Sequence, residues 1–137
     1  MTTRVHNQIA FALLFTALSP VFAVAAPPEA PETVMITLRA KAGAEAELAQ
    51  VIARHWEAVQ RLKLVTDAPH VTLRGTEAAE GGGTRTFFVD VFTWRDPSVP
   101  DAAPKEILAL WADMNRLVEK RNGRPGLTID EMTLVAQ

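Results

Sequence analysis

The sequence predicts an α+β fold whose elements follow the order strand, helix, strand, strand, helix, strand. Apolar residues alternate with polar ones in four segments, as expected of strands with two unlike faces. In two further segments they recur every three or four positions, as in amphipathic helices. The chain has 137 residues, which suits a single domain. One sheet with a layer of two helices is therefore expected.

The first 25 residues are expected to be a signal peptide and not part of this domain. A basic start at Arg4 precedes an apolar segment from Ile9 to Leu18, and Ala23 and Ala25 then fit an A-x-A cleavage site. The apolar segment has about ten residues, whereas a membrane-spanning helix needs roughly twenty. We therefore predict cleavage after Ala25 and a secreted or periplasmic mature protein that is not bound to the membrane.

Residues 26–32, "APPEAPE", are expected to be a Pro-rich tether, and the domain occupies residues 33–137. Its first strand alternates between an aliphatic side and a mixed side, formed by Val34, Ile36, Leu38 and Ala40 and by Met35, Thr37 and Arg39. The different composition of the two sides predicts that only the aliphatic side is covered by helices.

The first helix is expected from Ala44 to about Leu64. Its apolar stripe consists of Leu48, Val51, Ile52, His55, Trp56, Val59 and Leu62. Acidic residues lie in its first turn and basic residues in its last turn, which favours the helix dipole at both ends. Pro69 is expected to stop this helix, because a proline disfavours helical geometry in the residue before it.

The second half of the chain predicts two further strands, a helix and a last strand. The strands cover residues 70–77 and 86–95, joined by a glycine-rich hairpin. The second helix carries the stripe Ile107, Leu110, Trp111, Met114, Leu117 and Val118. We expect Asp101 to cap it, Pro104 to lie in its first turn and Gly123 to end it. Residues 127–137 form the last strand.

This order is the split βαβ arrangement of ferredoxin-like folds, with a four-stranded antiparallel sheet and two helices on one face. The other face must then meet water or a second subunit. For residues 86–95 we expect Phe87, Val89, Val91 and Thr93 beneath the helices. The opposite side, with Phe88, Asp90, Phe92 and Trp94, is expected on the helix-free face. The mixed sides of the other three strands are expected on the same face: Met35, Thr37, Arg39, Thr72, Arg74, Thr128, Asp130 and Met132.

Asp90 is the residue that needs a partner in this arrangement. Because the third strand lies between the first and second in such a sheet, Arg39 and Arg74 are expected to approach Asp90. The trio could anchor a ligand through guanidinium groups or form a purely structural ion-pair network. A large aromatic surface is rarely left open on a soluble protein. We therefore predict a homodimer whose helix-free faces meet and enclose a cavity.

The stretches "VMITLRAKAGAEAEL" and "FFVDVFTWRD" resemble the antibiotic biosynthesis monooxygenase-like family of dimeric α+β barrels, over about Val34 to Val135. The resemblance implies a homodimer with a pocket between the helix layer and the sheet. Some members oxidise quinols or polyketide-like aromatics with O₂ and without a cofactor, and others degrade haem. Trp94 matches the strand-end tryptophan that lines the pocket in some members. The haem ligand, a histidine on the second helix, is missing from Ile107 to Arg121.

Each candidate site residue also has a structural interpretation. Trp94 is a pocket wall or a dimer-core aromatic, together with Phe88 and Phe92. His55 and Asp90 are the candidate catalytic residues. His55 is either a base for a phenolic proton or a neutral core histidine. Asn115 is either a donor to a bound oxygen or a solvated helix residue, and His70 is expected at the surface.

Composition excludes several kinds of chemistry. The chain has no Cys and no Tyr, so thiol nucleophiles and phenolic acids are lacking. Ser98 has no G-x-S-x-G context, and the histidines lack H-E-x-x-H spacing, so neither a serine hydrolase nor a zinc site is expected. A net charge of −2 without a basic block argues against nucleic acid as a partner.

Three functions remain open. The first is a protein that binds a small, flat, apolar or aromatic molecule, with Arg39, Arg74, Phe88, Phe92, Trp94 and Asn115 as ligand-binding residues. The second is a cofactor-independent monooxygenase that acts on a phenolic or quinol substrate, with His55 as its base. The third is a structural dimer without a ligand. No metal or other cofactor is expected for any of them.

Overall fold

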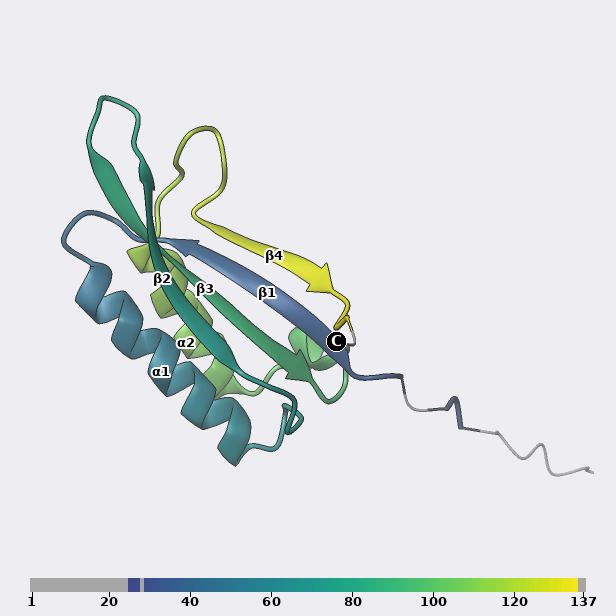
Figure 1. Cartoon of the computed structure of the whole chain (residues 1–137). Coiled ribbons are helices and arrows are strands. Elements are labelled where there is room, and N and C mark those ends of the chain that lie inside the picture. Colours follow the sequence, from purple (N-terminus) through teal and green to yellow (C-terminus); the bar gives the residue numbers. More distant parts are fainter. Residues whose placement is uncertain (1–24, 28, 136–137) are drawn as a thin grey trace, which may run out of the picture.

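The structure, a computed structural model, describes residues 25–27 and 29–135; the predicted signal peptide lies, except for Ala25, outside the described residues. The elements are β1 (Glu32–Arg39), α1 (Glu45–Arg61), β2 (Val71–Ala78), β3 (Thr84–Trp94), the 3₁₀ helix η1 (Val99–Ala102), α2 (Lys105–Leu117) and β4 (Leu127–Met132) (Figure 1). The predicted order of strands and helices is confirmed. β4 is shorter than expected and ends at Met132.

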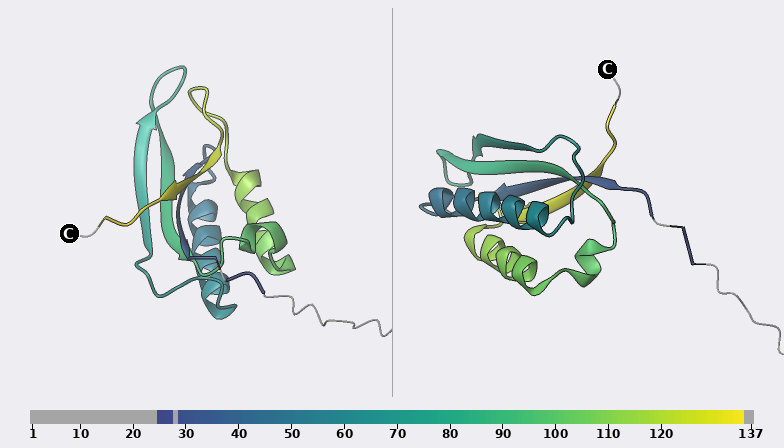
Figure 2. Two further views of the ribbon diagram at one scale, coloured as in Figure 1. Left: turned by 90° about the vertical axis from the view of Figure 1, so that its right-hand side faces the viewer. Right: turned by 90° about the horizontal axis from the view of Figure 1, so that it is seen from below.

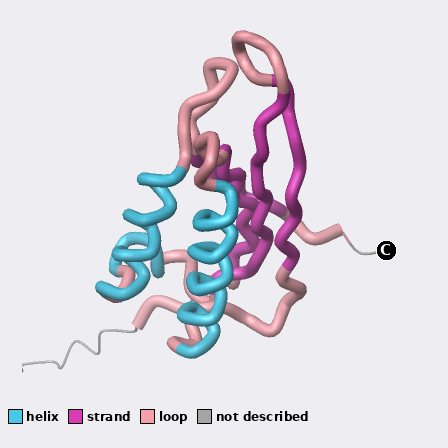
Figure 3. Tube along the Cα trace, turned by 90° about the vertical axis from the view of Figure 1, so that its left-hand side faces the viewer, coloured by secondary structure: helices cyan, strands magenta, loops and turns pink. Residues whose placement is uncertain are grey.

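The four strands form one antiparallel sheet in the order β2-β3-β1-β4. β3 therefore lies between β1 and β2, as predicted. Both helices lie on the same side of this sheet, and among the described residues the other side carries no helix (Figures 2 and 3). The prediction of an α+β fold with two helices against a four-stranded antiparallel sheet is confirmed.

α1 ends earlier than predicted, and Pro69 does not end it. Lys63 adopts a left-handed backbone conformation with φ of 57°. The chain turns there, and the amide of Leu64 donates to the carbonyl of Val59. The buried side of α1 otherwise follows the predicted stripe, with Trp56 and Leu62 only partly buried.

Both predicted ends of α2 were wrong. Asp101 belongs to η1, and Pro104 occupies the position before the first helical residue. Gly123 is left-handed, with φ of 74°, but the helix has already ended at Leu117. It ends there because Val118 is extended and pairs with Ala40 beside the end of β1.

The sides assigned to β1 and β4 are confirmed, and those assigned to β2 and β3 were wrong. Val34, Ile36 and Leu38 of β1 pair with Phe92, Asp90 and Phe88, and directly paired residues project to the same face of a sheet. The aromatic side of β3 therefore faces the helices, where Phe92 and Trp94 are buried. Large aromatic rings gain more from burial than valines do, which favours this arrangement despite the carboxylate that it also buries.

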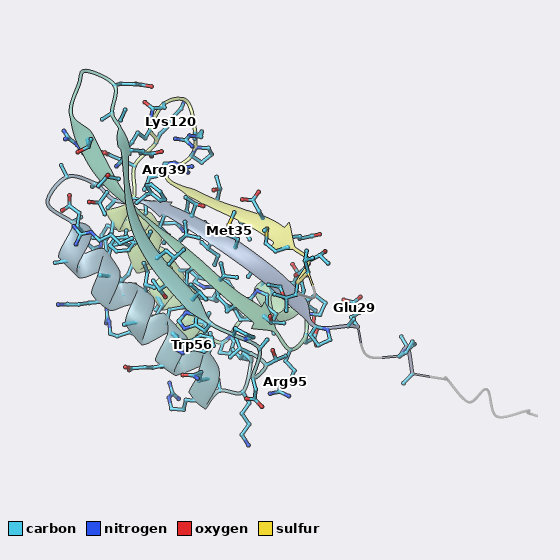
Figure 4. The ribbon with its side chains drawn as sticks, viewed as in Figure 1. Glu29, Met35, Arg39, Trp56, Arg95 and Lys120 are labelled. Carbon is cyan, nitrogen blue, oxygen red and sulfur yellow. The ribbon has the colours of Figure 1, made fainter. Side chains whose placement is uncertain are left out.

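The helix-free face is consequently aliphatic more than aromatic. Its apolar side chains are Met35, Val71, Leu73, Phe87, Val89, Val91 and Met132. Leu73 is 57% exposed and Val71 42%; Met35 and Arg39 lie along β1 on this face (Figure 4). Within the described residues, neither helix has the length and apolar character needed to cross a membrane.

Candidate functional site

Asp90 is buried under the helices, and its partners come from β2 and the loop before it. His70 Nε2 lies 2.7 Å from Asp90 Oδ1, and the Thr72 hydroxyl donates to the same oxygen over 2.7 Å. A buried carboxylate requires such hydrogen bonds. Asp90 is therefore tolerated in an aromatic strand because β2 and the loop before it each supply one donor.

The predicted trio of Arg39, Arg74 and Asp90 does not form. Arg39 lies on the opposite face of the sheet from Asp90, because it pairs with Phe87. Its guanidinium donates to the carbonyl of Pro125 and lies 3.4 Å from Glu77. Arg74 is on the side of Asp90 but is exposed. The error follows from the reversed faces of β2 and β3.

Arg39 instead belongs to an ionic cluster at one end of the sheet. Arg121 and Arg124, from the loop between α2 and β4, both contact Glu77 of β2. Arg121 also donates to the carbonyls of Ala40 and Thr86. Burial and the neighbouring Arg124 lower the pKa of Arg39. These contacts hold the loop to the β2–β3 hairpin, so the cluster has a structural role.

His70 is not the freely exposed residue that the sequence predicted. Its ring stacks on Trp56 of α1, with ring centroids 3.8 Å apart and planes 16° apart, and its side chain is only 19% exposed. Together with its contact to Asp90, this stacking connects α1 to the buried side of the sheet. The only sign of this contact in the sequence is the spacing of two residues between His70 and Thr72, which allows both side chains to reach the same side of the sheet.

His55 is completely buried among aromatic rings. Its Nε2 accepts a hydrogen bond from the Trp111 indole over 3.1 Å, while its Nδ1 is buried without a partner in the described part of the chain. Desolvation lowers the pKa of His55 to about 4, despite the nearby carboxylate of Asp90. These contacts favour the neutral core histidine, and a role as base stays a prediction.

The aromatic side chains of β3, α1 and α2 form one continuous cluster. Phe92 and Trp94 meet edge to face with centroids 4.7 Å apart, and Trp94 meets Trp111 in the same way at 6.4 Å. Phe88 and Phe92 are both part of the buried core. Neither of these phenylalanines borders the cavity described next, whereas Trp94 and Trp111 do.

A cavity of about 360 Å³ lies between α2 and the β1–β4 half of the sheet. Val34, Ile36, Trp94 and Met114 are its buried residues, and Trp111 is half-buried. The remaining lining residues are nearer to solvent: Glu32, Pro100, Asn115, Leu127, Ile129 and Glu131. Most of the lining is apolar.

The polar groups of this cavity are few and lie toward its opening. Asn115 is exposed on α2. Glu32 is the cross-strand neighbour of Trp94, and Glu131 pairs with Val34, so both acids point to the helix side. Desolvation and then the adjacent Glu131 raise the pKa of Glu32. The Trp111 N–H is already used by His55.

The predicted site residues are thus only partly brought together. Trp94 and Asn115 border the cavity, while Asp90 and His55 lie in the packed core behind it. Sequence reasoning missed Trp111, Glu32 and Glu131. Trp111 was assigned to the apolar stripe of the helix, because periodicity cannot separate a cavity wall from the core. Glu32 was assigned to the tether, because it directly follows the Pro-rich segment.

Within residues 25–27 and 29–135, no three His, Asp or Glu side chains gather in a way that could hold a metal ion. A scan against protein-family models, a search of curated proteins and a search of solved structures each found no match for this chain. The site must therefore be interpreted from its own geometry.

Proposed function

We propose that this protein binds a small, flat, largely apolar molecule in the cavity beneath α2. The observation that carries the proposal is the meeting of two indoles, Trp94 from β3 and Trp111 from α2, at an otherwise apolar cavity. Ligand sites typically measure a few hundred Å³ and combine an apolar lining with a few placed polar groups. Asn115 at the opening supplies one such group.

The order of the elements is compatible with a ferredoxin-like fold, and we propose that the chain belongs to the antibiotic biosynthesis monooxygenase-like family. Support comes from the motifs quoted above and from a cavity located between the helix layer and the sheet, where that family's pocket is expected. Fold likeness does not transfer chemistry. We further propose that the mature protein is exported, on the strength of the signal-like first 25 residues.

A homodimer through the helix-free face is part of the same proposal. Leu73, Val71 and Met132 are exposed there beside half-buried Phe87, Val89 and Val91. A contiguous apolar face of this kind is typical of an interface. The residues differ from those expected from the sequence, but the physical reason for a partner is unchanged.

Ligand binding is tested by calorimetry with a neutral flat probe, 2-naphthylmethanol, on the wild-type protein and on Ile129→Trp. Ile129 is 61% exposed at the cavity opening, so a bulky ring there should block entry without disturbing the core. Leu108→Trp is the matched control, because Leu108 is 49% exposed on α2 and does not border the cavity. Binding that is lost only in Ile129→Trp supports the proposal; binding equal in both variants removes it.

Cofactor-independent oxidation of a quinol remains the second candidate, and oxygen uptake with a quinol panel tests it. His55→Ala should abolish uptake if His55 is the base. The burial and lowered pKa of His55 favour binding over turnover as the first proposal.

A further inference from the structure

We propose that the ligand of this cavity is an organic cation, with a flat apolar body and a protonated amine. The inference rests on the proposed binding function and adds the charge of the ligand. It comes from the position of Glu32 and Glu131 at the opening of a cavity that is otherwise aromatic and aliphatic.

The two carboxylates are placed by the sheet register. Glu32 begins β1 opposite Trp94, and Glu131 of β4 lies opposite Val34, one strand away. Both residues therefore project to the helix-covered side, at the same end of the cavity. The pairing of Thr33 with Met132 and of Val34 with Glu131 makes Glu32 and Glu131 diagonal neighbours on adjacent strands, and burial and Glu131 raise the pKa of Glu32.

No positive charge compensates this pair. The cavity lining contains no Lys, Arg or His, and the ion pairs of the described residues involve neither Glu32 nor Glu131. Two like charges beside each other disfavour the free protein. A cation between them would remove that repulsion, and the repulsion therefore favours binding of a positive group.

The remainder of the cavity suits the same ligand class. Trp94 and Trp111 offer aromatic surface, and tryptophan attracts a cation over its ring face. Val34, Ile36 and Met114 supply the apolar contact that a hydrocarbon body needs. A carboxylate or phenolate ligand would instead meet two glutamates without a basic partner, so anionic substrates are disfavoured.

The test compares three probes of nearly equal shape by calorimetry: 2-naphthylmethylammonium, 2-naphthylmethanol and 2-naphthoate. We expect the ammonium probe to bind about tenfold more tightly than the neutral alcohol, as charge contacts with half-buried Glu32 and exposed Glu131 and a cation–π contact would give. The naphthoate should bind most weakly. Added salt should reduce the preference for the ammonium probe.

The double variant Glu32→Gln/Glu131→Gln should lower the ammonium-to-alcohol ratio to about one and leave the affinity for the alcohol unchanged. Glu57→Gln/Glu80→Gln is the control, since it removes the same charge from exposed positions that do not border the cavity. It should keep the wild-type ratio.

The outcomes separate the two proposals. Binding of the alcohol without preference for the ammonium probe overturns this inference and leaves the proposed binding function standing. Tighter binding of naphthoate, or an equal loss of preference in both double variants, also overturns it. Binding of none of the probes to the wild-type protein contradicts the binding function and the inference together.

Discussion

The buried carboxylate of Asp90 is held by hydrogen bonds from half-buried His70 and exposed Thr72. Asp90→Ala removes both of these hydrogen bonds, and hydrogen bonds to a charged group contribute about 1.5–3 kcal/mol. We expect a loss of that size in the free energy of unfolding, measured with urea. Asp90→Asn keeps an acceptor and should lose less; an Asp90→Ala protein as stable as wild type would contradict the assignment.

His55 gives the protein a specific dependence on pH. Its pKa falls from 6.5 to about 4 on burial, so between these values the unfolded chain binds a proton that the folded protein does not. Stability should therefore decrease as pH falls from 6.5 to about 4, by at most about 3 kcal/mol from this residue. Asp90 raises this pKa and His70 lowers it, both by less than the effect of burial.

The contribution of His55 is isolated by comparison with His55→Gln, whose amide can still accept from Trp111. Urea denaturation of both proteins at pH 7 and at acidic pH should show a shallower decrease for the variant. Parallel decreases in the two proteins would mean that His55 is not held neutral by burial.

At the level of elements, β3 is where sequence prediction succeeded and failed most clearly. Alternation correctly separated Phe88, Asp90, Phe92 and Trp94 from Phe87, Val89 and Val91. It could not decide which set meets the helices, because both sets are largely apolar. The charge of Asp90 suggested, wrongly, that its side of the strand faces away from the helices. The decision depends on the aromatic area gained and on donors from β2, and neither is visible within β3 alone.

The two sides of β3 should respond differently to truncation. Phe92→Ala removes a fully buried ring and should cost about 3–5 kcal/mol. Val89→Ala, on the helix-free face, should cost less than about 1 kcal/mol of the subunit's own stability. Urea denaturation at low protein concentration compares the two. A larger cost for Val89→Ala would mean that the faces are assigned wrongly.

The cavity shows a different limit of sequence reasoning. Trp94 and Asn115 were identified because the family resemblance and the helix edge pointed to them. Glu32, Trp111 and Glu131 were not, because the cavity exists only once α2 packs across β1 and β4. Spacing within a single segment carries no information about that packing.

For the whole molecule, the helix-free face predicts the oligomeric state. Val91 lies at its centre, between Met35 of β1 and Val71 of β2. Val91→Lys should convert a dimer to a monomer, since an unpaired charge in an apolar interface is strongly unfavourable. Sedimentation measures the mass of each species. Leu108→Lys, an exposed change on α2, should leave the dimer intact, and a monomeric wild-type protein would exclude this interface.

Ligand binding beneath α2 is the claim on which the functional account depends. The most direct measurement is an NMR titration of the ¹⁵N-labelled protein with 2-naphthylmethanol, following backbone amides and the indole N–H signals of Trp94 and Trp111. We predict that the largest shifts occur at these indoles and at Met114, Asn115 and Ile129. Shifts confined to the helix-free face, or no shifts at saturating probe, would contradict a ligand site in this cavity.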